Sequence, residues 1–253
     1  MAPRISTAVR QKFPTLTETF DDYEESADQY ESTFQERFAP PRRDPGGGFA
    51  LIDAARFVSL SAHARARVLS WAMIEAINAG LAASLFLAAR AHFEMAGMEA
   101  YLLWKCRQFR VGQLSEGNLR LMVDRLFLGR RFSMDGDPVA GIPQNEQAVQ
   151  VLNLIDAVDH IFEKEPDLCG SFREGYEWLS ELCQPNVQSR LGDHEINASD
   201  GSAVFYRVPV ITESDIGMTL SHANMSHIVF LHCFEQFGEL VQGWERALRG
   251  GLC

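Results

Sequence analysis

The sequence contains no cysteines at metal-binding spacing and no long uncharged apolar run. Its five cysteines are scattered and form no C-x-x-C pair, which favours reduced thiols over a disulfide framework or a zinc site. No stretch is long and apolar enough to cross a bilayer, and the first residues lack the apolar core of a secretory signal. We therefore expect a cytoplasmic protein that does not associate with a membrane.

Basic residues are also scarce relative to acidic ones. The chain has 23 Lys and Arg against 34 Asp and Glu, a net charge of −11. This balance argues against a non-specific DNA coat, which needs a basic surface. The sequence motifs of zinc proteases, P-loop proteins and serine hydrolases are absent too, so we expect no cofactor. His222, His227 and His232 recur every five residues and point in different directions around a helix, so we expect no metal site there.

The apolar residues that are present repeat every three or four positions over most of the chain, which predicts helices. Around Asp200-Gly201 the pattern changes to alternation, which predicts a β-hairpin at about 194–210. The expected fold is mostly α: a bundle of five or six long helices with one β-hairpin inserted before the last helix. Helices are predicted at about 15–38, 49–78, 81–110, 115–131, 145–164, 168–183 and 213–249.

The first helical segment is separated from the rest by a change in composition. Residues 15–38 carry an apolar, aromatic stripe on an otherwise acidic helix, and Thr15 with Glu18 matches a capping box. The segment RRDPGGG at 42–48 is the clearest linker. We therefore expect an acidic amphipathic arm at 1–41 and a helical bundle domain at 49–253. The aromatic stripe either docks on the protein's own core or binds a protein partner.

The apolar run around AARAHFE (88–94) contains a charged pair one helical turn apart. At 100° per residue, Arg90, Glu94, Gly97, Tyr101 and Lys105 fall within about 80° of one another and form a polar ridge, while most other directions are apolar. Such a helix is usually buried, and a buried arginine needs a counter-ion, which Glu94 can supply. The pair is either a structural bridge between packed helices or a working site in the bundle interior. Gly97 leaves a gap that another backbone or a ligand can fill.

A second polar feature ends the helix predicted at 168–183. In YEWLSELCQPN (176–186), Tyr176 belongs to a core stripe, and Gln184 and Asn186 flank a proline that stops the helix. These polar groups either satisfy the orphan carbonyls of the helix end or pack over the Arg90 end of the ridge. The polar loop that follows adds two candidates for a pocket beside the ridge, Arg190 and His194. His92 faces away from Glu94 by about 160°, and we expect it to be a partly buried packing histidine.

The two motifs together resemble a family. The pattern RA-x-x-E, then Y-x-x-L-S-E-x-x-H-P-N and a polar loop leading to a hairpin, resembles a widespread group of uncharacterised helical bacterial proteins. That group is similar in pattern to HEPN-like and abortive-infection-type domains, and the match covers about 81–210. The resemblance implies a role in bacterial stress or phage defence, with RNA as the partner. It also implies a homodimer, because HEPN-type ribonucleases use an arginine and a histidine across a dimer interface.

One departure from the pattern changes the expected chemistry. Gln184 replaces the histidine of H-P-N, and an amide cannot exchange protons near neutral pH. Arg56 and His63 have a HEPN-like spacing, but about 1.7 such pairs are expected by chance from the residue frequencies, so this one pair is no evidence. Two hypotheses follow: a degenerate HEPN-like ribonuclease or RNA-binding relative, or a non-enzymatic module that binds a protein through the acidic aromatic helix. The candidate catalytic residues are Arg90 and Glu94, and the candidate binding residues are Tyr101, Lys105, Tyr176, Gln184, Asn186, Arg190 and His194.

Overall fold

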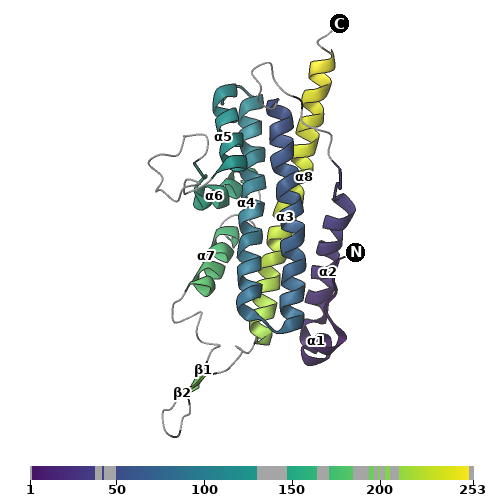
Figure 1. Cartoon of the computed structure of the whole chain (residues 1–253), viewed down its shortest axis with the longest axis vertical. Helices are drawn as coiled ribbons and strands as arrows, with labels where there is room; N and C mark the ends of the chain where they lie inside the picture. The colour runs from purple at the N-terminus through teal and green to yellow at the C-terminus, as the bar shows by residue number, and fades with distance from the viewer. Residues whose placement is uncertain are drawn as a thin grey trace.

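A computed structural model shows that the chain is mostly helical, as the apolar periodicity predicts (Figure 1). It describes residues 2–37, 42, 50–129, 147–163, 171–184, 194–196, 199, 203–205 and 211–250. The elements are α1 Thr7–Lys12, η1 Pro14–Leu16, α2 Thr17–Thr33, α3 Leu51–Ala79, α4 Ala82–Arg110, α5 Glu116–Leu128, α6 Val151–Ile161, α7 Ser171–Cys183, β1 His194–Ile196, β2 Ala203–Phe205 and α8 Glu213–Gly250.

Three long helices, α3, α4 and α8, run side by side along the molecule (Figure 1). Helix α4 is the central one, because it packs against α3, α8 and the three shorter helices α5, α6 and α7. The turn between α3 and α4 is short because Gly80 adopts a left-handed conformation, with φ of 70°. Its N–H and that of Leu81 donate to the carbonyls of Ile77 and Ala76, which closes the end of α3.

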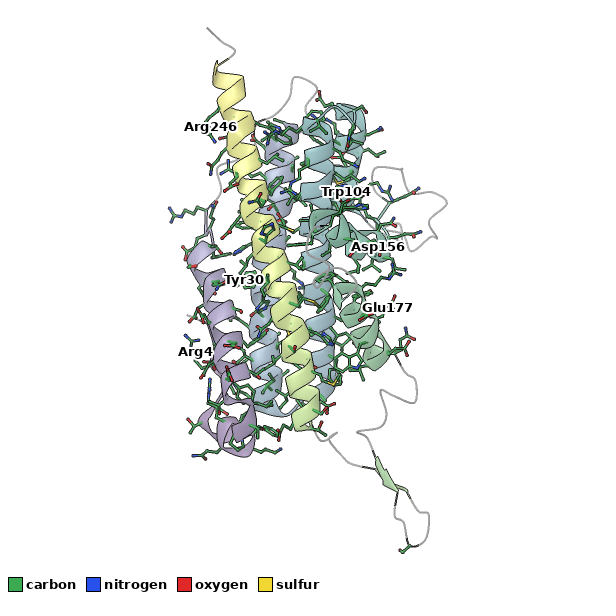
Figure 2. All side chains as sticks on the ribbon, turned by 180° about the vertical axis from the view of Figure 1, so that it is seen from behind. Arg4, Tyr30, Trp104, Asp156, Glu177 and Arg246 are labelled. Carbon is green, nitrogen blue, oxygen red and sulfur yellow. The ribbon has the colours of Figure 1, made fainter. Side chains whose placement is uncertain are left out.

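The N-terminal arm is part of the core. The stripe residues of α2 face α3 and α8, and Phe20, Tyr23 and Tyr30 are fully buried (Figure 2 shows Tyr30 between α2 and α8). Of the two alternatives for this stripe, docking on the protein's own core is therefore the one observed. The linker prediction at 42–48 lies outside the described residues except for Arg42, whose guanidinium pairs with Asp53 at 2.9 Å.

The predicted helix at 15–38 is too long at both ends. Pro14 opens a short 3₁₀ turn, so α2 begins at Thr17 and the capping box of Thr15 and Glu18 does not form. Thr15 instead donates its hydroxyl hydrogen bond to Glu213 at the start of α8. The helix ends at Thr33, because Phe34 is extended, with ψ of 129°.

The remaining helices lie close to their predicted positions. Ser115 caps α5 through a hydrogen bond from the N–H of Asn118 at 3.3 Å. In the region of the predicted hairpin, β1 and β2 pair antiparallel, with Glu195 opposite Val204. Most of 194–210 lies outside the described residues, so the longer hairpin stays a prediction. No helix in the described chain is both long enough and apolar enough to span a membrane.

Candidate functional site

Arg90 and Glu94, both on α4, form a half-buried pair on the side of the helix that faces α7. Arg90 Nη2 lies 3.5 Å from Glu94 Oε1, and the two side chains are 34% and 32% exposed. Tyr176, on α7, joins the pair: its hydroxyl accepts from Arg90 Nη2 at 3.2 Å and donates to Glu94 Oε1 at 3.3 Å. The Arg90 guanidinium also lies 5.6 Å from the centre of the Tyr176 ring. The predicted ion pair is therefore present, and Tyr176 holds it.

The end of α7 meets Arg90 differently from the prediction. Cys183 lies beside the guanidinium. Burial raises the pKa of its thiol, and the nearby positive charge of Arg90 offsets only part of this rise. Gln184 is exposed, and no contact links it to Arg90 in the described part of the chain. The acceptor for Arg90 is the Tyr176 hydroxyl rather than a terminal carbonyl, because the core stripe of α7 turns Tyr176 towards α4. Asn186 and Arg190 lie outside the described residues.

The polar ridge of α4 is divided in two at Gly97. Helix α6 crosses there so closely that a Cβ on Gly97 would lie 2.8 Å from the carbonyl oxygen of Leu154. The gap that Gly97 leaves is thus filled by backbone. Beyond the crossing, Lys105 Nζ lies 3.5 Å above the ring of Trp104, and burial lowers the pKa of this amine. Arg90, with Glu94 and Tyr176, and Lys105, with Trp104, therefore form two separate groups on either side of the α6 crossing.

Of the other predicted binding residues, Tyr101 belongs to the Lys105 group, with its ring centre 5.4 Å from Lys105 Nζ. Tyr101 lies beside Trp104, with ring centres 6.0 Å apart, and burial raises the pKa of its hydroxyl. Trp104 in turn stacks on His160 of α6 at 4.0 Å. His194 starts β1, and only its backbone is described. The ridge therefore provides two small half-buried clusters rather than one site.

A polar cluster that the sequence analysis did not predict lies in the centre of the bundle. His92 is fully buried, with Nε2 2.8 Å from the Tyr30 hydroxyl and Nδ1 2.7 Å from Ser226 Oγ. Because Ser226 donates its own proton to the carbonyl of Ala223, we assign the ring proton to Nδ1, so that Nε2 accepts from Tyr30. Burial holds the pKa of His92 well below its ordinary value, so the ring is neutral. His227 lies 4.4 Å from it, ring centre to ring centre.

Glu99 is a second buried polar residue that the ridge pattern of α4 did not predict. It lies on the apolar side of α4, is 0% exposed and accepts a hydrogen bond from Ser59 Oγ at 2.6 Å. Its other oxygen, Oε2, has no hydrogen-bond partner among the described residues. Burial raises the pKa of this carboxyl to about 7. In the sequence, Glu99 is a single acidic residue on an otherwise apolar helix face, and this pattern could have identified it.

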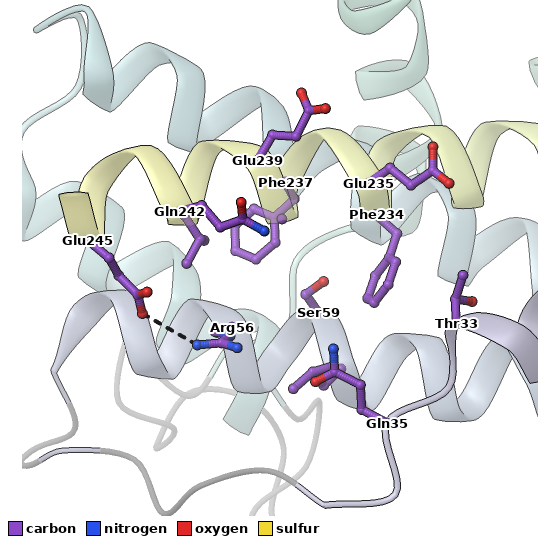
Figure 3. A pocket seen from close by; sticks show the side chains of 13 residues that line it. Thr33, Gln35, Arg56, Ser59, Phe234, Glu235, Phe237, Glu239, Gln242 and Glu245 are labelled. Carbon is purple, nitrogen blue, oxygen red and sulfur yellow. Dashed lines mark hydrogen bonds and ion pairs between the residues drawn. The ribbon is translucent and has the colours of Figure 1, made fainter. Parts of the chain in front are cut away.

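A cleft of about 400 Å³ opens between the end of α2, helix α3 and the C-terminal half of α8 (Figure 3). Its floor includes Ser59, which links it to Glu99, and Thr33, whose hydroxyl lies 2.8 Å from Nε2 of the buried His63. Burial lowers the pKa of His63 to about 4, so this ring is neutral as well. The lining residues are Thr33, Gln35, Arg56, Ser59, Leu60, Phe234, Glu235, Phe237, Gly238, Glu239, Val241, Gln242 and Glu245.

The cleft is open because small residues line both of its walls. On α8, Phe234, Gly238 and Gln242 follow one another at intervals of four and so share a face of the helix. Gly238 has no side chain, and a Cβ built there would meet no atom within 4 Å. Ser59 on α3 is also small. Larger side chains in place of Gly238 and Ser59 would fill the space that forms the cleft.

Comparisons with known proteins identify no family: no family model, no curated protein and no solved structure matches this chain. Within the described residues, no group of three or more His, Cys, Asp or Glu could hold a metal ion. The resemblance to HEPN-like proteins and the role that it implies therefore stay predictions.

Proposed function

We propose that this protein is a non-catalytic binding protein whose ligand enters the cleft between α2, α3 and α8. The observation that carries the proposal is the floor of the cleft, where Ser59 and Thr33 are each held by a buried polar side chain. Clefts of this size with aromatic walls and a few fixed polar groups are typical of small-molecule sites.

The surroundings of Arg90 support binding rather than hydrolysis. Cleavage of RNA by acid–base chemistry needs a group that exchanges protons near neutral pH, beside the arginine. In the described part of the chain, no histidine forms a hydrogen bond or an ion pair with Arg90 or Glu94, and Tyr176 occupies both. These contacts are those of a structural bridge between α4 and α7.

RNA binding by a degenerate HEPN-like dimer in bacterial stress or phage defence is a second candidate. One observation favours it: the Arg90 side chain is about one-third exposed, so part of its guanidinium is open to a ligand. An accessible guanidinium is suited to a phosphate. If Arg90 contacts RNA, Arg90→Ala should weaken filter binding of total RNA at low salt at least fivefold. Arg65→Ala, at an exposed arginine of α3, is the control. An equal loss of RNA affinity in both variants would mean that the binding is non-specific charge attraction.

The contacts of α2 argue against the other sequence hypothesis, a protein partner bound through the aromatic face of the N-terminal helix. That face is buried in the bundle. Several acids on the remaining faces already pair within the chain: Arg4 with Asp28 at 2.6 Å, and Arg10 with Glu24 at 3.0 Å. A protein partner could contact only the acidic residues of α2 that do not already pair within the chain.

The cleft proposal is tested with two glycine variants of α8. Gly238→Leu should fill the cleft, and Gly243→Leu is matched to it, because a Cβ at either position meets nothing within 4 Å and Gly243 does not line the cleft. Both changes remove a glycine from a helix, so both proteins should fold at least as stably as the wild type. Binding of four pentyl probes is then measured by isothermal titration calorimetry: 1,5-diaminopentane, 1-aminopentane, 1-pentanol and pentanoate.

The proposal predicts that at least one probe binds to the wild type and to Gly243→Leu, and that Gly238→Leu weakens this binding at least tenfold. Binding by none of the four probes, or equal binding to both variants, would overturn it.

A further inference from the structure

We propose that the natural ligand of the cleft is an alkyl diammonium of the polyamine class. The inference rests on the proposed function, since it names the chemistry of the molecule that would occupy the same cleft. Three features of the lining carry it: an excess of carboxylates at the rim, aromatic walls, and a floor that offers hydrogen-bond acceptors backed by an acid.

The rim carries more negative than positive charge. Of the three lining glutamates, Glu245 faces Arg56, with Oε1 3.4 Å from Nη1 (Figure 3). Glu235 and Glu239 form no ion pair with a described residue, and in Figure 3 they extend from α8 away from Arg56. They therefore place two uncompensated carboxylates at the solvent side of the cleft. A cation is the ligand charge that this rim favours, and the net charge of −11 steers cations in the same direction.

The walls suit an alkyl chain that carries positive charge. Phe234 and Phe237 line the space below the rim, together with Leu60 and Val241. Methylene groups gain by leaving water against such side chains. The face of a phenyl ring also attracts an ammonium group, by about 0.5–2 kcal/mol depending on its exposure. An anionic ligand would gain from the apolar contacts and from Arg56, whose guanidinium already pairs with Glu245.

The floor can accept a second ammonium group. Ser59 donates its proton to Glu99 Oε1, so its oxygen still has lone pairs to accept a hydrogen bond from a ligand. The Glu99 carboxyl behind it is fully buried, and its Oε2 has no partner among the described residues. A cation at Ser59 would stabilise the ionised form of Glu99 by Coulomb attraction. An ammonium at each end of an alkyl chain therefore matches both the rim and the floor.

The end groups of the ligand are tested with the same four pentyl probes and the full-length protein. At pH 7.5 and low salt, 1,5-diaminopentane should bind at least tenfold more tightly than 1-aminopentane, and pentanol and pentanoate more weakly still. The double variant Glu235→Gln with Glu239→Gln should reduce the affinity for the diamine at least fivefold, without changing that for pentanol. Glu18→Gln, at an exposed acid of α2 outside the cleft, should leave every affinity unchanged.

The outcomes separate this inference from the proposed function. If pentanol or pentanoate binds as tightly as the diamine, and Gly238→Leu abolishes that binding, the cleft is a binding site but not one for diammonium ions. Equal affinities for the diamine and 1-aminopentane would likewise overturn the role of the floor. If no probe binds, both proposals fail.

Discussion

The hydroxyl of Tyr30, on the N-terminal helix α2, hydrogen-bonds Nε2 of His92, on the central helix α4, at 2.8 Å. Both residues are 0% exposed. This bond joins the segment that the sequence sets apart as an arm to the middle of the bundle. The neutral imidazole is held on its other side by Ser226 of α8, so three helices meet through one ring.

We expect Tyr30→Phe to destabilise the protein by about 1–2 kcal/mol, because it leaves the buried Nε2 of His92 without a donor. The shape of the core hardly changes, so the loss measures the hydrogen bond itself. Urea denaturation followed by circular dichroism gives the free energy of unfolding. A stability equal to that of the wild type would show that the bond contributes nothing.

A methyl group at Gly97 should be costly for a different reason. In Gly97→Ala the new Cβ would lie 2.8 Å from the carbonyl oxygen of Leu154 and 2.9 Å from its carbon, so α6 must move away from α4. We expect a loss of about 1–3 kcal/mol, despite the better helix propensity of alanine. Gly117→Ala on α5 is the control, because a Cβ there meets no atom within 4 Å. If both variants lose equally little in thermal denaturation, the helix crossing is not tight.

Removing the Arg90–Glu94 pair should cost little. Both side chains are about one-third exposed, so water screens the pair, and Arg90→Ala should lose about 1 kcal/mol rather than the 3–5 kcal/mol of a fully buried pair. The double variant Arg90→Met with Glu94→Leu should recover most of this loss, because neither charge is left alone. Chemical denaturation of the two variants and the wild type decides the matter. A loss above about 3 kcal/mol in Arg90→Ala would mean that the pair behaves as a buried one.

The sequence predicts helices well and their mutual contacts less well. The stripe of α2 and the ridge of α4 are each patterns within a single helix. The burial of the stripe and the pairing of Arg90 with Glu94 could therefore be predicted from the sequence. Gly97 could be recognised as a gap, but α6 as its occupant could not, because the crossing depends on two helices distant in the chain. The cleft is missed for the same reason: Gly238 and Ser59 are ordinary small residues until α8 lies beside α3.

Glu99 should make the stability of the protein fall as the pH rises. Its pKa is raised to about 7 in the folded state, against 4.5 in an ordinary glutamate, because burial disfavours the charge. The folded state then holds a proton that the unfolded state releases, so its contribution is fully present below pH 4.5 and is lost as the pH rises through 7. Glu99→Gln removes this loss, and we expect it to stabilise the protein by about 3 kcal/mol at pH 8 relative to its effect at pH 4. Urea denaturation at both pH values measures the difference, and a constant effect of the substitution would contradict the shift.

His227 should act in the opposite direction. Both of its ring nitrogens are buried without a hydrogen-bond partner among the described residues, and burial lowers its pKa to about 3. The ordinary value is 6.5, so the unfolded state takes up a proton that the folded state refuses, and stability is lost as the pH falls from about 6.5 towards 3. Phenylalanine neither binds that proton nor buries unpaired polar atoms.

We therefore expect His227→Phe to raise the melting temperature at pH 8 and to raise it further at pH 5, where the wild type has lost the contribution of the neutral ring. His232→Phe, at an exposed position of the same helix, is the control for the substitution itself. Differential scanning calorimetry at both pH values tests this. A destabilised His227→Phe protein at pH 5 would mean that the ring nitrogens are hydrogen-bonded in solution and that this histidine stabilises the core.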